Sequence, residues 1–244
     1  MTGAIDLLLV VVGASLLITI VLALGAWAIL VVGDALVRRG PAAERRLRDL
    51  EVTDITHREP PVTASLAPWR SELVEQRFQR FGEVEVRAKG ERDAATIWVL
   101  QQDDGAMLAE LLDRPRLLTL TTPYAAGEGV ETSVGRDGGT VVDDGIHIVS
   151  QRLLGFDDAL DLHRVAAEPF VRRSIDGPIR LTDMAGYLEW EREHRRRFAA
   201  HHVRSALMPA QASLAWIRHG MPRLALSLAI LAAAEVLLLL LPRQ

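Results

Sequence analysis

The sequence contains no cysteine and no asparagine, and Lys89 is the only lysine among its 28 lysine and arginine residues. Without cysteine, the chain cannot form a disulfide framework or a thiolate metal site. Lysine and asparagine share A-rich codons, so their scarcity indicates a GC-rich bacterial genome. A net charge of −4 over 244 residues gives no reason to expect a nucleic-acid partner.

Recognisable reaction motifs are missing as well. The sequence has no serine-nucleophile elbow, no phosphate-binding loop and no dinucleotide fingerprint. We therefore predict no catalytic residue and no metal ligand, and we leave the identity of any cofactor open. The absence of these motifs favours a non-enzymatic protein over an enzyme.

Two membrane-length apolar stretches are present, one near each end of the chain. Residues 7–32 carry no charge and exceed the ~20 residues needed to cross the hydrocarbon core, so we predict a transmembrane helix over residues 6–33. The alternative is a signal peptide. Its apolar core would span only ~7–15 residues after a basic segment, whereas this run is longer and follows Asp6.

The second stretch, residues 224–241, contains a single charge, Glu235, and ends in a run of leucines. We predict an interfacial segment and a second transmembrane helix over residues 212–241, with Trp216 at the interface. A buried helix of a soluble protein is the alternative.

Arginines flank the inner ends of both stretches, which predicts a cytoplasmic middle and two exterior termini in the inner membrane of a bacterium. Those near the first stretch also suit contact with anionic lipid headgroups, although a purely topogenic role explains them equally well. The arginines after the first stretch are Arg38, Arg39, Arg45, Arg46 and Arg48, and those before the second are Arg218 and Arg223.

Small residues recur every four positions in both stretches and predict close helix packing, within the chain or against a partner subunit. Alanine is common in this sequence, so chance explains the pattern equally well. Glu235 is costly inside a membrane and must be neutralised or paired. We expect either snorkelling or an internal bond to Ser15, or contact with a partner or ligand. The small residues are Ser15, Thr19 and Ala23 in the first stretch and Ala225, Ala229 and Ala233 in the second.

Between the stretches, residues 41–68 predict a basic juxtamembrane helix, over residues 41–58, followed by a proline-rich linker. Residues 69–208 then predict a soluble α+β domain. A helix over residues 69–81 precedes alternating segments separated by Gly turns, which indicate an antiparallel β-meander. The segments are residues 84–87, 96–101, 106–112, 116–122, 130–134 and 146–152.

Two helices are expected to close the domain, over residues 156–173 and over residues 183–207, the second ending near Pro209. This order favours helices packed on one face of the sheet. A curved sheet gripping a helix is a weaker alternative.

Several polar groups in the middle invite a chemical interpretation, but each has a simpler explanation. Three Asp-Gly pairs lack the spacing of a calcium loop and suit hairpin turns. We expect His163 to be a partly buried histidine on an acidic helix. His194, His201 and His202 share a helix face, but two helical turns separate His194 from the other two, so we expect aromatic packing rather than a shared ion. The arginine cluster at residues 192–197 is interleaved with glutamates and suits a solvated face.

Three functions remain open. The first is a non-enzymatic membrane subunit that acts as a scaffold or accessory component of a larger complex, with lipids and membrane proteins as partners. The second is a membrane-tethered cytoplasmic sensor whose sheet holds a ligand near Trp98. The third is a membrane-bound hydrolase that uses His163 or His147 with a carboxylate.

Overall fold

A computed structural model of the chain describes residues 2–152, 154–173 and 177–240, and for residues 219–240 and some of residues 2–36 it describes the backbone alone. The chain divides into two compact units. We call Arg39–Pro209 the globular unit, and Met1–Arg38 together with Ala210–Gln244 the helical unit.

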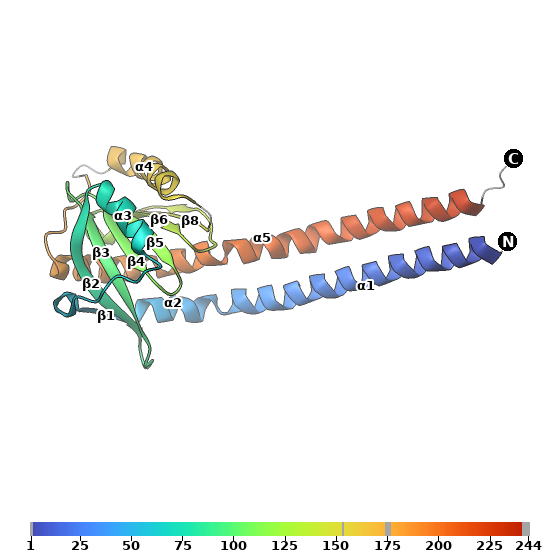
Figure 1. The fold of residues 1–244 in the computed structure, drawn as a ribbon, viewed down its shortest axis with the longest axis horizontal. Coiled ribbons are helices and arrows are strands. Elements are labelled where there is room, and N and C mark those ends of the chain that lie inside the picture. Colours follow the sequence, from blue (N-terminus) through green and yellow to red (C-terminus); the bar gives the residue numbers. More distant parts are fainter. Residues whose placement is uncertain (1, 153, 174–176, 241–244) are drawn as a thin grey trace. The chain divides into compact units, whose positions relative to one another are not determined.

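The globular unit is α+β, as the sequence predicts, and is built on one eight-stranded sheet (Figure 1). The strand order across the sheet is β1-β2-β3-β4-β5-β6-β8-β7. The strands are β1 (Leu50–Asp54), β2 (Phe78–Ala88), β3 (Ala94–Gln102), β4 (Leu108–Leu112), β5 (Leu117–Pro123), β6 (Gly129–Val134), β7 (Val141–Asp143) and β8 (Ile146–Gln151).

The meander over β2 to β6 confirms the strand and turn prediction. Neighbouring strands are antiparallel, with pairs such as Val99 opposite Glu110 and Leu120 opposite Thr132. Two of the Asp-Gly pairs form the turns after β3 and β7, where Gly105 and Gly145 adopt positive φ values of 75° and 79°. Glycine is favoured in such turns because it has no Cβ to clash in the left-handed region.

The far edge of the sheet departs from a simple meander because β8 pairs in parallel with β6. Strand β7 lies outside β8 and pairs with it in the antiparallel sense. The link between β6 and β7 therefore crosses two inter-strand spacings, about 10 Å, and leaves a slot that β8 fills. The sequence signals the β7–β8 turn but not this crossing.

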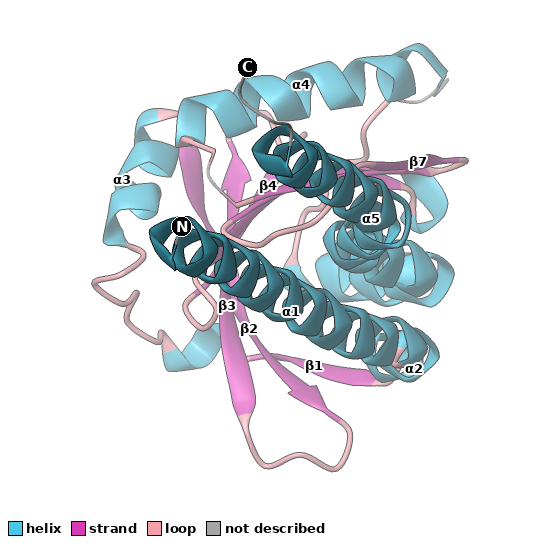
Figure 2. Cartoon of the chain, turned by 90° about the vertical axis from the view of Figure 1, so that its right-hand side faces the viewer, coloured by secondary structure: helices cyan, strands magenta, loops and turns pink. Residues whose placement is uncertain are grey.

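Helices cover both faces of the sheet, so the expectation of helices on one face is wrong. One face packs against α3 (Ala67–Glu75) and α4 (Phe156–Arg173), which lie on the same side in Figures 1 and 2. The other face packs against the first half of α5 (Met184–Leu240). Inward-facing residues alternate accordingly: Val99 and Leu108 contact the α5 side, whereas Trp98 and Ala109 contact the α3 and α4 side.

Three helix boundaries differ from the prediction. The helix expected over residues 69–81 is α3, which ends at Glu75 because strand β2 already begins at Phe78 and pairs with β3. The basic helix α2 (Gly40–Arg48) ends well before residue 58, because the next residues form the edge strand β1. Helix α5 does not end near Pro209 but continues to Leu240. Phe198 and Leu214, which lie on either side of the proline, are both buried. Their burial stabilises the continuous helix by more than the loss of the backbone hydrogen bond at Pro209 destabilises it.

In the helical unit, α1 (Thr2–Arg38) and the last part of α5 run close together. Gly33 permits this approach, since a Cβ there would lie 2.6 Å from a methyl group of Leu214. Among the described side chains, one helical stretch is apolar and long enough to span a membrane, within Ile20–Arg48, with a mean hydropathy of 2.4. A signal sequence meets the same criterion. A second span over residues 212–241 stays a prediction.

Candidate functional site

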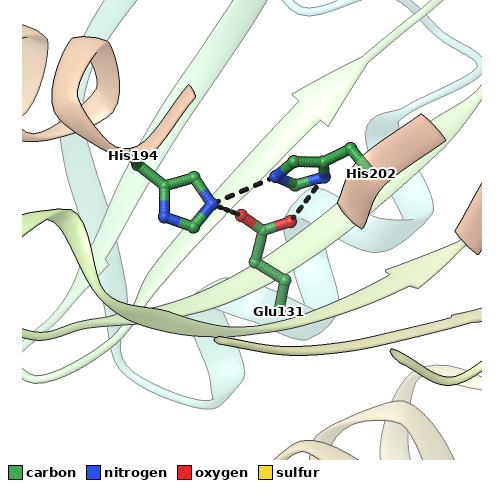
Figure 3. A group of neighbouring side chains, drawn as sticks. All are labelled: Glu131, His194 and His202. Atoms are coloured by element: carbon green, nitrogen blue, oxygen red, sulfur yellow. Dashed lines mark hydrogen bonds and ion pairs between the residues drawn. The ribbon is translucent and has the colours of Figure 1, made fainter. Parts of the chain in front are cut away.

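Three ionisable side chains meet between the sheet and α5 in the globular unit. Figure 3 shows Glu131, in the middle of β6, directed at the rings of His194 and His202 on α5. The His194 Nε2 atom lies 2.6 Å from Glu131 Oε1 and 3.1 Å from His202 Nε2. The His202 Nδ1 atom lies 3.6 Å from Glu131 Oε2. We call these three residues the Glu-His-His cluster.

The two histidines meet although eight positions separate them along one helix. Eight residues span ~12 Å of an α-helix, and each ring reaches part of that distance along the helix axis. Two helical turns therefore do not keep the two rings apart, and the expectation that they would is wrong. The sequence also gives no sign of Glu131, because pairing it with α5 requires knowing that this helix covers its face of the sheet.

The ring of His194 is held by its surroundings. Its Nδ1 atom lies 2.6 Å from the carbonyl oxygen of Gly127, in the turn before β6, and Nδ1–H donates to that oxygen. Gly127 has a φ of 72°, and a Cβ there would lie 2.7 Å from the backbone nitrogen of His194. Trp190 stacks on the His194 ring with centroids 4.8 Å apart. This turn therefore sits against α5 only because residue 127 is glycine.

The cluster holds one buried ion pair and one neutral histidine. Burial opposes a charge on His194, but the adjacent Glu131 carboxylate outweighs burial and raises the His194 pKa to about 9. Burial also opposes the charge on Glu131, but interactions with His202 and His194 lower its pKa to about 2. The pKa of His202 falls to about 4, mainly because the ring is buried, so its contact with Glu131 is a polar contact of a neutral ring.

Further polar groups of the same layer surround the cluster. Glu110 accepts a hydrogen bond from the Tyr187 hydroxyl at 2.9 Å, and burial raises the Glu110 pKa to about 8. Glu191 pairs with Arg195 at 3.0 Å. Arg136 lies close enough to Glu131 to help lower its pKa. The interface between the sheet and α5 is thus a buried polar layer rather than a purely apolar core.

His163 lies on α4, on the opposite face of the sheet, and is fully buried. Its two ring nitrogens bond to Thr122 at 2.9 Å and Thr132 at 3.1 Å. His163 is therefore more deeply buried than the sequence led us to expect. Both partners are hydroxyl groups, which is the arrangement of a satisfied core histidine and not of an acid–base pair.

Burial lowers the pKa of His163 to about 4, against about 6.5 for an unfolded histidine. Between these pH values His163 is protonated in the unfolded chain but neutral in the folded chain. The free energy of unfolding therefore falls as the pH falls. We expect His163 to account for about 2 kcal/mol of lost stability between pH 7 and pH 5. Denaturant unfolding of the full chain in detergent at both pH values, compared with His163→Gln, measures this share. Equal pH slopes for the two proteins would contradict it.

The five arginines predicted to contact headgroups are exposed, on the last turn of α1, between the helices, or on α2. Three of them pair with acids of the same chain. Arg38 lies 2.7 Å from Asp34, Arg48 lies 2.6 Å from Glu44, and Arg46 pairs with Glu91. Headgroup binding by Arg38, Arg39, Arg45, Arg46 and Arg48 stays a prediction.

The predicted intramembrane contacts fall on α1 and α5, but their side chains lie outside the described part of the chain. These residues are Ser15, Thr19, Ala229, Ala233 and Glu235.

Two residues named for the sensor and hydrolase alternatives have structural partners. Trp98 belongs to the core, and its indole N–H donates to the Pro60 carbonyl at 2.9 Å. His147 Nδ1 lies 3.2 Å from the Ala166 carbonyl oxygen. Because Trp98 is packed in the core, it gives no support to a ligand bound by the sheet. Because the contact of His147 is with a carbonyl and not a carboxylate, it gives no support to a hydrolytic pair.

Comparisons with protein-family models, with curated proteins and with solved structures give no significant match to this chain.

Proposed function

We propose that the chain is a non-enzymatic integral membrane protein that serves as an accessory or scaffold subunit of a larger membrane complex. The observation that carries this proposal is the exposed apolar surface of α1. Side chains such as Leu17, Val21 and Trp27 are 60–65% exposed, and only 6% of the most apolar window is buried. Contiguous apolar surface of this extent suits lipid or a protein partner.

The globular unit gives less support to a catalytic role than to a non-enzymatic one. A cavity of about 240 Å³ lies between β1 and α5, below the usual volume of a small-molecule site. Among its lining residues are Arg48, Arg192 and Arg195, with Glu51 as the acid. The Glu-His-His cluster is buried, so it offers no open cleft for a substrate.

The membrane arrangement belongs to the same proposal. We place a second span within residues 212–241, the globular unit in the cytoplasm and both termini outside, because arginines flank the inner ends of both stretches. We assign Glu235 to a contact with a partner subunit, since an intramembrane carboxylate needs a partner.

Native mass spectrometry of the protein, extracted from its own membrane in mild detergent, tests this function. We expect stoichiometric partner subunits to accompany the chain, and Glu235→Leu to lose at least one of them. Val236→Leu is the matched control, because it changes a neighbouring apolar residue and should retain every partner. A chain that emerges alone and monodisperse would contradict the proposed function. If Glu235→Leu retains every partner, Glu235 does not contact a partner subunit, and internal pairing or snorkelling accounts for it instead.

A further inference from the structure

We infer that Glu131, His194 and His202 form a binding site for a divalent first-row transition-metal ion, and Zn²⁺ is the ion with which the site can be tested. One donor atom from each residue lies within 4.8 Å of the others, and the donors come from a strand and from two separate turns of a helix. Imidazole nitrogen and carboxylate oxygen are the donors that Zn²⁺ binds in three-ligand sites.

The spacing of the donor atoms fits one ion. Two nitrogens bound to a tetrahedral Zn²⁺ at ~2.0–2.1 Å lie about 3.3 Å apart. The His194 and His202 Nε2 atoms are 3.1 Å apart, which is within a small adjustment of that value. Glu131 Oε1 is closer, at 2.6 Å from His194 Nε2, so a bound ion would take the place of that hydrogen bond. The Nε2 proton of His194 would then be released to solvent. Water would complete the coordination.

The residues around His194 orient its ring as a ligand. Metal-binding histidines usually donate their other ring N–H to a carbonyl or carboxylate, which fixes the tautomer. His194 Nδ1–H donates to Gly127 in this way, and Trp190 covers the ring face. The Nε2 atom is thereby directed at Glu131 and His202 (Figure 3).

The surrounding charges permit a cation in this buried place. The Glu131 carboxylate favours it, whereas Arg136 opposes it. Burial raises the pKa of Glu110 and of Glu191, so these two side chains add less negative charge than two free carboxylates would. The side chain of His202 is 16% exposed, whereas that of His194 is 1% exposed, so an ion would enter from the His202 side.

The test uses the full-length protein in detergent, stripped of metal by a chelator, with ZnCl₂ titrated by calorimetry. We expect one Zn²⁺ per chain and a higher melting temperature when Zn²⁺ is bound. His202→Gln should weaken Zn²⁺ binding at least 10-fold, since replacing a residue that merely orients a metal ligand typically lowers metal affinity 10–100-fold. The matched control is His201→Gln, because His201 is the neighbouring residue but bonds to Asp143 and lies outside the cluster. It should bind Zn²⁺ as the wild type does.

A second variant keeps the proposal testable if His202→Gln fails to fold. His202→Cys replaces one ligand by another, and the chain has no native cysteine. With Co²⁺ it should give a thiolate-to-metal charge-transfer band that wild-type protein lacks. No Zn²⁺ binding by folded wild-type protein, or equal affinity in wild type and folded His202→Gln, would overturn the metal site. So would a folded His202→Cys that shows no such band. The cluster would then be a hydrogen-bonded ion pair only.

Discussion

Replacing Glu131 by leucine is expected to cost about 3–5 kcal/mol of folding stability, because it removes one member of a buried ion pair. His194 would lose the carboxylate 2.6 Å from its Nε2 atom and would have to give up its proton to stay buried. Denaturant unfolding of the metal-free chain in detergent, followed by tryptophan fluorescence, measures the loss. Glu168→Gln is the control, since its partner Arg172 is exposed and the pair should contribute little.

A double-mutant cycle separates the pair from general damage to the core. Because the charge and its partner leave together, Glu131→Leu combined with His194→Leu should cost clearly less than the sum of the two single replacements. Simple additivity of the two losses would contradict the coupling between Glu131 and His194.

Gly127→Ala is expected to cost about 3 kcal/mol, from two sources. The residue has a φ of 72°, which an L side chain adopts at a cost of ~1–2 kcal/mol. In addition, its Cβ would lie 2.7 Å from backbone nitrogen of His194 and 2.9 Å from the Glu193 carbonyl carbon, so the turn must move away from α5. The same unfolding measurement applies to this variant.

Gly90→Ala isolates the first of these sources. Gly90 has a similar φ of 83°, but a Cβ there would meet nothing within 4 Å. Its replacement should therefore cost only the ~1–2 kcal/mol of backbone strain. Equal losses for Gly90→Ala and Gly127→Ala would show that the close approach of this turn to α5 adds no stability.

The parts of the fold that the sequence predicts are those whose signals are local. Alternating apolar residues and Gly turns locate β3 to β6, and the amphipathic pattern locates α4 at residues 156–173. The region around α2 differs, because two local patterns meet there. Residues 50–54 alternate Leu50 and Val52 with polar residues and pair with the edge of β2 as strand β1, but the arginine-rich helical pattern before them leads directly into this segment.

Non-local features account for the remaining differences. The parallel pairing of β6 with β8 depends on a slot left by β7, and the continuation of α5 through Pro209 depends on packing on either side. The Glu-His-His cluster belongs to the same class. The spacing of His194 and His202 predicts that they share a helix face. Glu131 lies beside them only because α5 packs on its face of the sheet.

The central claim, a membrane-anchored chain with its globular unit in the cytoplasm, can be tested by cysteine labelling, because the native chain has no cysteine. Glu168→Cys places one thiol on an exposed position of the globular unit. A membrane-impermeant maleimide should label it in inverted inner-membrane vesicles and leave it unlabelled in intact spheroplasts. Labelling in intact spheroplasts, with protection in inverted vesicles, would contradict the account.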